Sequence, residues 1–381
     1  MNSFLQERFQ RYYTGAEVPP PRRFTRREYG FVFFEQPGMT RHVGFKRHDE
    51  LLKLLREQAP AHVYHSSAYY EAPDAASMQE KGWMGADLIF DLDADHLPGA
   101  TEMQYEEMLA AVKQELKKLV SFLTDDFGFT AEELSLYFSG GRGYHCHVVH
   151  PEVLPLESQE RREIVDYITA RGLDLDAVLQ EKTIARRGRM TQTALQIAPP
   201  STPGWRGKIS RDIVDFFQEL REMEPDEAME LLTSFEGIGE KTARGILNDV
   251  TEERIERIRR GKIDQSTYIK KIMPQLVKRC AVELRGEPDE PVTGDVKRLI
   301  RQPGSLHGKT GLRVQPVPLD DIDGFNPLRD AVVFSDASID VELEHPVEIS
   351  MMEQSFSLQK GSVEVPEYLA VLLAGRGLAH V

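Results

Sequence analysis

The chain carries an apolar run that ends in two acidic residues, Asp87-Leu88-Ile89-Phe90-Asp91-Leu92-Asp93. Alternate side chains of a β-strand point to the same face, so Asp91 and Asp93 share one face of the predicted strand and their carboxylates can converge on a cation. Hard oxygen ligands suit Mg2+ or Mn2+. The segment therefore predicts a divalent-metal site built on a strand.

The composition is that of a soluble globular protein. The 381 residues are enough for two domains with their own cores, and contents of 40% hydrophobic and 29% charged residues are ordinary for this class. We recognise no transmembrane segment and no signal peptide. The two cysteines, Cys146 and Cys280, cannot build a disulfide framework or a four-thiolate zinc site. We therefore expect a cytoplasmic protein without a membrane partner.

The charge is acidic, with 47 Lys and Arg against 62 Asp and Glu and a formal balance of −15. A nucleic-acid-binding domain usually shows a basic footprint instead. Basic residues cluster in two places, at Arg22, Arg23, Arg26, Arg27, Arg41, Lys46 and Arg47, and at Lys182, Arg186, Arg187 and Arg189. The clusters are compatible with a basic groove on an acidic body, but taken alone such runs are more often solvated charged faces.

Hydrophobic periodicity divides the chain into three parts. The first part predicts strands at 42–45, 62–64, 88–90, 134–138 and 144–149, with helices at 50–56 and 101–123, the latter opened by a capping box of Thr101 and Gln104. The middle part is helical, at 158–170, 211–223, 226–235, 252–260 and 266–280. Strand patterns return at 331–334, 341–343, 347–349 and 355–358 before a last helix at 366–373. We expect a discontinuous α/β catalytic domain of residues 1–154 and 284–381, with mixed sheets and flanking helices, and an inserted helical lobe of residues 155–283.

A glycine-rich segment joins two of these strands, Ser139-Gly140-Gly141-Arg142-Gly143-Tyr144-His145. Glycines let a backbone approach phosphate oxygens, Arg142 adds a charged fork, and His145 can donate to a phosphate. A plain hairpin loop followed by a structural histidine is the alternative. The acidic pair upstream and a basic segment with its own histidine downstream favour the phosphate site.

Three segments together resemble the catalytic small subunit of archaeal and eukaryotic DNA primase, and the archaeal form most closely. They are hydrophobic-Asp-x-Asp at 90–93, Ser-Gly-x-x-Gly-x-His at 139–145, and Asp289 followed by Leu-Ile-Arg-x-Pro-x-Ser-x-His-x-Lys-Thr-Gly at 299–311. The similarity extends to residues 27–31 and 365–370. Order, spacing and number make the combination specific.

The resemblance implies a role for each matching residue. Asp91, Asp93 and Asp289 would be the catalytic carboxylates that hold two Mg2+ or Mn2+ ions. The nucleotide phosphates would be bound by Ser139, Arg142, His145, Arg301 and His307, with Arg41 as a further candidate. Such a site would polymerise nucleoside triphosphates by two-metal nucleotidyl transfer, making short RNA primers, or DNA primers as a variant, on a single-stranded DNA template. The implied partner is the primase large subunit, which carries an iron–sulfur domain and forms a heterodimer with the catalytic subunit.

The third carboxylate is chosen from four neighbouring acids, Glu287, Asp289, Glu290 and Asp295. Asp295 lies in a predicted helix over 293–301, where an acid in the first turn interacts favourably with the positive N-terminal end of the helix dipole. Glu287 and Glu290 each precede a proline and stay open as ligands. Asp289 is favoured by its short side chain and by a position before His307 that matches the primase pattern.

One departure from the family concerns zinc. Members commonly carry a Cys/His zinc motif between the acidic strand and the glycine-rich loop, whereas residues 94–138 contain no cysteine and a single histidine, His96. We expect no structural zinc.

The segment 235–247 contains a Gly237-Ile238-Gly239 turn followed by Lys241. It resembles the hairpin of a helix-hairpin-helix motif, in which Gly237, Gly239 and Lys241 would meet a DNA phosphate. An ordinary connection with glycine at a helix C-cap is the alternative, and Glu236 and Glu240 beside the turn would repel a phosphate.

Three other functions stay open. A repair-type primase-polymerase that fills gaps shares the same chemistry. A haloacid-dehalogenase-type phosphatase would use Asp91 as nucleophile, but it requires Thr or Val where this chain has Asp95. A non-enzymatic DNA-binding scaffold would explain the turn at Gly237 but not the converging acids.

Overall fold

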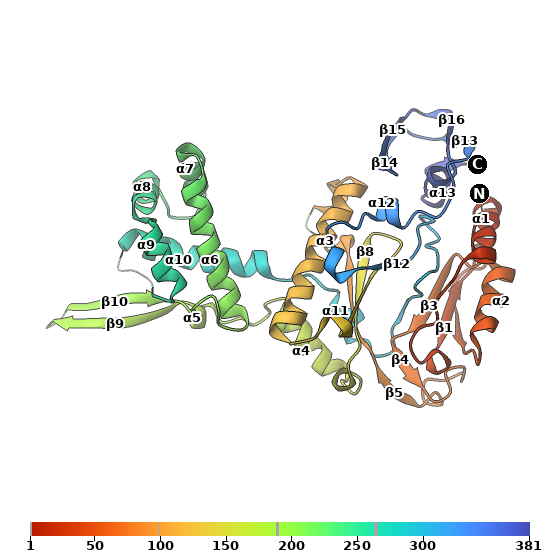
Figure 1. The fold of residues 1–381 in the computed structure, drawn as a ribbon, viewed down its shortest axis with the longest axis horizontal. Helices are drawn as coiled ribbons and strands as arrows, with labels where there is room; N and C mark the ends of the chain where they lie inside the picture. The colour runs from red at the N-terminus through yellow and green to blue at the C-terminus, as the bar shows by residue number, and fades with distance from the viewer. Residues whose placement is uncertain (1, 98, 188–189, 263–265) are drawn as a thin grey trace. The chain divides into compact units, whose positions relative to one another are not determined.

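The computed structural model describes residues 2–97, 99–187, 190–262 and 266–381 (Figure 1). The chain folds into two compact units. The first comprises Met1–Val120, Phe129–Val165 and Glu287–Val381, and the second comprises Ser121–Gly128 and Asp166–Gly286. No described helix has the length and apolar character that crossing a membrane requires.

The first unit contains a four-stranded antiparallel sheet that carries the acidic pair. Its strand order is β12 (Gln315–Val317), β7 (Leu134–Phe138), β8 (Gly143–Val148) and β6 (Leu88–Asp93). In β6 the apolar residues Leu88, Phe90 and Leu92 are fully buried, whereas Asp91 and Asp93 are only partly buried. Register pairs Asp91 with His145 and Asp93 with Gly143. The acidic strand and the glycine-rich loop are therefore direct neighbours.

A second four-stranded antiparallel sheet brings the downstream basic segment to the same unit. Its order is β11 (Leu299–Arg301), β3 (His62–Ser66), β1 (Tyr29–Val32) and β2 (Thr40–Val43). The helices α1 (Asn2–Gly15) and α2 (His48–Gln58) pack against each other beside it (Figure 1). Their shared core includes Phe9, Tyr13, Tyr29, Phe31, Leu51, Leu55, Val63 and Leu306. Pairing of Arg301 with Tyr64 fixes the position of β11.

Further elements complete the first unit. They are the pair β4 (Ala68–Tyr70) and β5 (Trp83–Ala86), the sheet of β13 (Ser338–Leu343), β16 (Gly361–Pro366) and β17 (Ala379–His380), the hairpin of β14 (Val347–Met351) and β15 (Gln354–Leu358), and the helices α3 (Tyr105–Ser121), α4 (Ser158–Ile168), α11 (Glu290–Gly294), α12 (Pro327–Asp330) and α13 (Glu367–Gly375). Helix α13 is buried from Glu367 to Ala374.

The second unit is largely helical. Its elements are α5 (Leu175–Val178), the hairpin of β9 (Gln180–Arg187) and β10 (Met190–Gln196), α6 (Trp205–Glu222), α7 (Pro225–Thr233), α8 (Glu240–Asp249), α9 (Glu252–Arg259) and α10 (Thr267–Leu284). Helix α6 packs on α9 and α10, and α8 packs on α7 and α10. Fully buried Ile209, Ile213 and Phe217 of α6 and Ile272 and Leu276 of α10 form its core.

The α/β class is confirmed, and several element predictions need correction. Residues 293–301 are not a helix, because α11 ends at Gly294 and residues 299–301 pair with β3 as a strand. Residues 331–334 form no strand, since the strand begins later, at Ser338. The insertion also contains the β9–β10 hairpin, which was not predicted. Helix α3 begins at Tyr105, and the Gln104 backbone N–H donates to the Glu107 carboxylate.

The two compact units also divide the chain at points other than those predicted. The start of α4, up to Val165, lies with the first unit. Residues 121–128, expected in the catalytic domain, lie with the second. Trp205 and Lys208 explain the latter, because the indole contacts the Phe122 ring at a centroid distance of 5.1 Å and the ammonium lies 2.8 Å from the Ser121 hydroxyl.

Candidate active site

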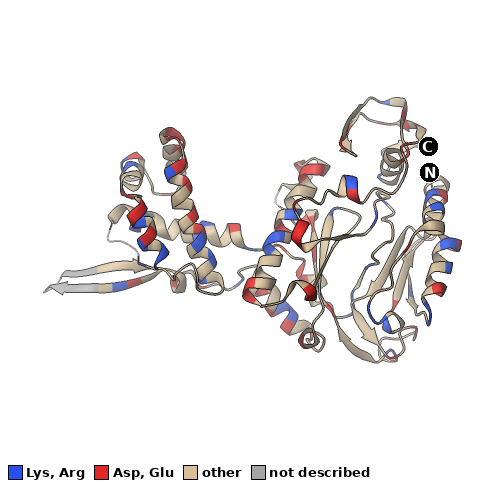
Figure 2. Cartoon of the chain, viewed as in Figure 1, with Lys and Arg blue, Asp and Glu red and all other residues tan. Residues whose placement is uncertain are grey.

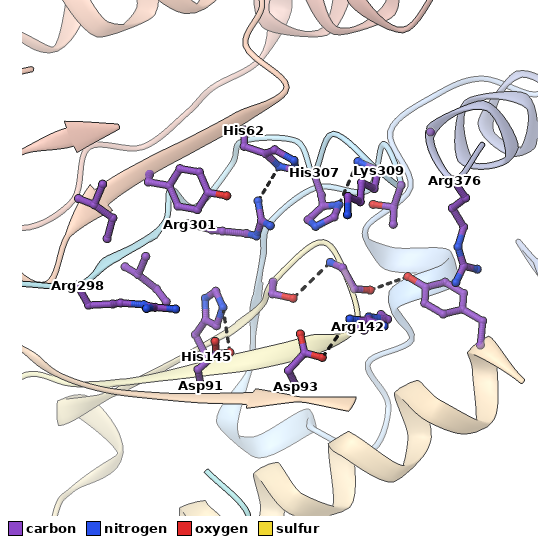
Figure 3. A pocket seen from close by; sticks show the side chains of 18 of the residues that line it. His62, Asp91, Asp93, Arg142, His145, Arg298, Arg301, His307, Lys309 and Arg376 are labelled. Atoms are coloured by element: carbon purple, nitrogen blue, oxygen red, sulfur yellow. Dashed lines mark hydrogen bonds and ion pairs between the residues drawn. The ribbon is translucent and has the colours of Figure 1, made fainter. Parts of the chain in front are cut away.

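A cleft of about 730 Å³ in the first unit gathers residues from all three sequence segments (Figure 3). Asp91 and Asp93 lie on one wall, and basic and histidine side chains face them (Figure 3). The polar and charged lining residues are His62, Tyr64, Asp91, Asp93, Tyr105, Ser139, Arg142, His145, Arg298, Arg301, His307, Lys309, Thr310 and Arg376. The cleft thus has an acidic wall, which carries Asp91 and Asp93, and a cationic wall opposite it.

Asp91 and Asp93 project from β6 into the cleft because alternate residues of a strand share a face. Asp289 lies next to them through the backbone, since its N–H donates to the Asp91 carbonyl oxygen at 2.9 Å. It caps α11, and its carboxylate accepts from the Val292 N–H at 3.4 Å. Asp289 does not line the cleft. In the described part of the chain, no three His, Cys, Asp or Glu side chains are arranged as a complete metal-ligand set.

The carboxylates nevertheless form an electrostatic cluster. Burial and then the nearby charges of Asp93 and Asp289 raise the pKa of Asp91 to about 7, against the opposing effect of Arg298 and Arg301. A buried acid whose ionisation is disfavoured by two neighbouring acids suits a divalent cation, which would compensate the charge and prefers hard oxygen ligands. The donor set therefore fits Mg2+ or Mn2+.

The glycine-rich loop is the turn between β7 and β8, and its glycines serve close packing. Gly140 has a φ of +78°, and a Cβ there would lie 2.8 Å from the Cβ of His307. A Cβ on Gly143 would lie 2.1 Å from the Leu92 carbonyl oxygen. The Ser139 hydroxyl accepts the N–H groups of Gly141 and Gly143, each at 3.3 Å. Ser139 therefore shapes the loop while also lining the cleft.

Arg142 and His145 lie beside the acids. Arg142 forms an ion pair with Asp95 and lies 3.7 Å from an Asp93 oxygen. His145 Nε2 lies 3.4 Å from Asp91 Oδ1. Burial, followed by the neighbouring His147 and Arg301, lowers the pKa of His145 well below its usual range. His145 is thus a neutral imidazole at physiological pH.

The opposite wall is organised around His62, which sequence reasoning missed. Its Nδ1 lies 2.7 Å from the Arg301 Nη1 and 3.2 Å from the Gly308 backbone nitrogen, so one acceptor receives two donors. Burial, together with the charges of Arg301 and Lys309, lowers the pKa of His62 to about 3. His62 is therefore the neutral acceptor that orients Arg301.

His307 completes this wall. Its ring contacts that of His62 at a centroid distance of 4.9 Å, and its Nδ1 accepts the Lys309 N–H at 3.3 Å. The proton of the neutral imidazole is then on Nε2. A Cβ on Gly141 would lie 3.0 Å from that nitrogen, so the glycine keeps the Nε2 donor accessible from the loop.

Arg41, predicted as a further phosphate ligand, lies outside the cleft. It pairs with the fully buried Glu28 at 3.1 Å. Burial would raise the pKa of Glu28, but hydrogen bonds from Arg41 and the His42 N–H and the charge of Lys81 lower it overall. Arg41 therefore compensates a buried acid.

The other basic residues have varied environments. Arg27 is buried and paired with Asp87 at 2.5 Å, and Arg189 lies outside the described residues. Lysine, arginine and acidic residues are interspersed along the helices of both units (Figure 2).

The Gly237-Ile238-Gly239 turn lies in the second unit. Gly237 has a φ of +75° and Ile238 is buried, while Lys241 is exposed at the start of α8. The Gly239 carbonyl accepts the N–H groups of Thr242 and Ala243, each at 2.9 Å. Within the described structure, a Cβ on Gly239 would meet no atom within 4 Å, so internal packing does not require a glycine there.

Seven polar or charged cleft residues were not among the predicted site residues, namely His62, Tyr64, Tyr105, Arg298, Lys309, Thr310 and Arg376. Lys309 stands in the 299–311 motif, which was a signal for it. Tyr64 and His62 reach the cleft because β3 pairs with β11, and the sequence carried no sign of that pairing.

Comparison with known proteins gives a consistent result. A family model described as DNA primase small subunit matches residues 90–319. Among similar curated proteins, the DNA primase small subunit PriS of Methanothrix thermoacetophila is 45% identical over 100% of this chain and 98% of its own length. The protein of the same name from Methanococcoides burtonii is 42% identical, covering 99% and 97%. That from Methanocella arvoryzae is 40% identical, covering 99% and 98%.

Proposed function

The chain belongs to the DNA primase small subunit family, and we propose that it synthesises short RNA primers on single-stranded DNA by two-metal nucleotidyl transfer. Family membership confirms the resemblance found in the sequence and makes the chain a primer-synthesising nucleotidyltransferase. We also propose the metals, the template and the role of each site residue. A replication enzyme acts where its template is, so we place it in the cytoplasm.

One observation carries the proposal. A single cleft sets Asp91 and Asp93 opposite Arg301 and His307, although these pairs are more than 200 residues apart in the sequence. A nucleoside triphosphate needs both walls, because its reacting phosphate must meet divalent cations while its outer phosphates need cationic donors. The acidic wall and the cationic wall of the cleft meet these two requirements.

Asp91, Asp93 and Asp289 would hold the Mg2+ or Mn2+ ions. Bound cations of this kind activate the primer 3′-hydroxyl and neutralise the pyrophosphate leaving group. Asp289 would turn its carboxylate from the Val292 N–H toward the ions, and its backbone is already hydrogen-bonded to that of Asp91. We propose no structural zinc, and chelator-washed protein should contain no stoichiometric zinc by elemental analysis.

The phosphate contacts follow from the protonation states. Arg142 and Arg301 supply permanent charge, and the neutral His307 donates from Nε2. Arg142 would exchange its ion pair with Asp95 for phosphate oxygens when a nucleotide binds. Ser139 acts by holding the loop that presents Arg142 and His145.

The partner proposed for this chain is the primase large subunit, since the relatives are named as small subunits. By family resemblance that partner brings an iron–sulfur domain, which the two cysteines of this chain cannot hold. Because the net charge of −15 disfavours binding to the DNA backbone, we propose that the partner supplies part of the contacts to the template. We also propose that Gly237, Gly239 and Lys241 contact a DNA phosphate, because internal packing does not explain Gly239.

The test uses the full chain, with and without the large subunit, on single-stranded template with labelled nucleoside triphosphates and Mg2+ or Mn2+. Labelled oligomers should form without an added primer. Asp91→Asn should abolish them, and Asp340→Asn, on an exposed strand position of β13, should not. Products seen only with an added primer would favour the repair-type gap-filling enzyme. Family membership leaves the phosphatase and scaffold alternatives without support.

A further inference from the structure

The end of helix α13 contributes a cation to the cleft that the mechanism above does not use. Arg376 is the C-cap of α13 and lines the cleft. The helix ends in a Schellman motif, in which the Leu378 N–H donates to the Leu373 oxygen at 2.8 Å and Gly377, with a φ of +71°, donates to Ala374 at 3.0 Å. Because the helix is buried and its C-terminus is capped by these two hydrogen bonds, the backbone of Arg376 has a fixed position.

The Arg376 side chain is held by an aromatic ring. Its guanidinium lies 4.4 Å from the centroid of the Tyr105 ring. Tyr105 is buried, and its hydroxyl donates to the Gly141 carbonyl oxygen at 2.6 Å. A continuous set of contacts therefore joins α13, α3 and the glycine-rich loop around Arg376.

Arg376 differs from Arg142 in its pairing. Arg142 is engaged by the carboxylates of Asp95 and Asp93. Arg376 lines the cleft and is exposed to solvent. Among the described residues, no carboxylate forms an ion pair with it, and its contact is the Tyr105 ring. An arginine whose planar face rests on a ring keeps its N–H edge available for an anion.

Position selects the phosphate that Arg376 can reach. The contacts run from Asp93 to Arg142, from the adjacent Gly141 to Tyr105, and from Tyr105 to Arg376. Figure 3 shows Arg376 on the side of Arg142 away from Asp91. In the proposed function the reacting phosphate lies at the acids, so the outermost phosphate lies toward Arg376.

We propose that Arg376 binds the terminal phosphate of the incoming nucleoside triphosphate and that Tyr105 positions it for this contact. The inference rests on the proposed function of the cleft. Its consequence is selectivity, since a nucleoside diphosphate lacks the group that Arg376 recognises. The C-terminal helix is then part of the nucleotide site.

The experiment compares the binding of ATP and ADP to the full chain, in Mg2+, by titration calorimetry. Arg376→Ala should weaken ATP binding roughly tenfold through loss of a charge-assisted hydrogen bond, and should change ADP binding less than twofold. Arg376→Lys, which keeps the charge, should recover part of the loss. Arg56→Ala, an exposed arginine on α2, should leave both affinities unchanged. In primer synthesis, the KM for ATP should rise with Arg376→Ala while kcat changes little.

Tyr105 provides an independent arm. Tyr105→Phe keeps the ring below the guanidinium and should preserve the preference for ATP, whereas Tyr105→Leu should reduce it as Arg376→Ala does. Thermal unfolding verifies that each variant is folded. Equal losses for ATP and ADP, or no loss, in folded Arg376→Ala would overturn the assignment. Failure of the wild-type chain to bind ATP at all would instead overturn the proposed function.

Discussion

Asp91→Asn should make the metal-free protein more stable while abolishing primer synthesis. Asn keeps the shape of the side chain and removes a charge from a buried position next to Asp93 and Asp289. The pKa of Asp91 is raised to about 7 from its usual value of 3.8, chiefly by burial and then by these two acids. The folded metal-free protein therefore pays for ionising this group, and the variant does not.

The sign and the pH window follow from that shift. Because folding raises the pKa, the wild-type protein keeps its full stability below pH 3.8 and loses stability as pH rises to about 7. The two values differ by an amount that corresponds to about 4 kcal/mol over the whole window. Between pH 5 and pH 8.5, the stability of Asp91→Asn relative to wild type should grow by about 3 kcal/mol, with almost all of the growth below pH 8.

The assay is denaturant unfolding of both proteins in a chelator at several pH values, repeated with Mg2+. Magnesium should stabilise the wild-type protein and leave Asp91→Asn unchanged, because the variant lacks a charged ligand. Asp340→Asn serves as the matched control. A stability difference that does not vary between pH 5 and pH 8.5 would refute the carboxylate cluster. Normal primer synthesis by the variant would refute its role in catalysis.

Three further predictions concern neighbouring groups. Arg142→Ala and His307→Ala should each raise the KM for nucleotide roughly tenfold while the affinity for fluorescent single-stranded DNA stays constant; a fall in DNA affinity instead would assign them to the template. Asp289→Asn should abolish synthesis, whereas Asp295→Asn, which weakens a 2.9 Å hydrogen bond from the Lys297 N–H, should cost about 1 kcal/mol of stability and keep activity; the reverse result would move the third ligand. His62 has a pKa of about 3 in the folded protein and about 6.5 in the unfolded chain, so protons favour unfolding as the pH falls below 6.5. The stability advantage of wild type over His62→Asn should therefore shrink by about 2 kcal/mol between pH 7 and pH 5, which chemical denaturation at the two pH values measures.

The parts of the site that lie within one strand or one turn could be predicted from the sequence. Asp91 and Asp93 share a face because strand periodicity is a local property. The 139–145 loop was recognisable because its strands are adjacent in the chain and pair directly. Strand periodicity and turn residues are properties of consecutive positions, so these parts of the site could be inferred without knowing any long-range contact.

The parts that depend on pairing between distant segments could not be predicted. His62 orients Arg301 only because β3 and β11 are neighbours, and a three-residue edge strand has too few residues for a periodic signal. The same pairing explains why residues 293–301 were wrongly predicted as a helix. Arg41 was a candidate ligand by resemblance, and nothing in the sequence shows that it pairs with Glu28, which is fully buried.

The acidic balance of the chain and its cationic cleft are compatible because the relevant potential is local. The acids on the exposed helices lie among basic residues, where solvent and salt screen them (Figure 2). In the cleft, Arg298, Arg301 and Lys309 face a volume of about 730 Å³ whose walls exclude much of that solvent. A triphosphate therefore meets an attractive field that the net charge of −15 does not reveal. Single-stranded DNA extends beyond any such cleft and meets the acidic exterior as well. Nucleotide affinity should consequently depend less steeply on salt than template affinity, and the large subunit has more to contribute to template binding than to nucleotide binding.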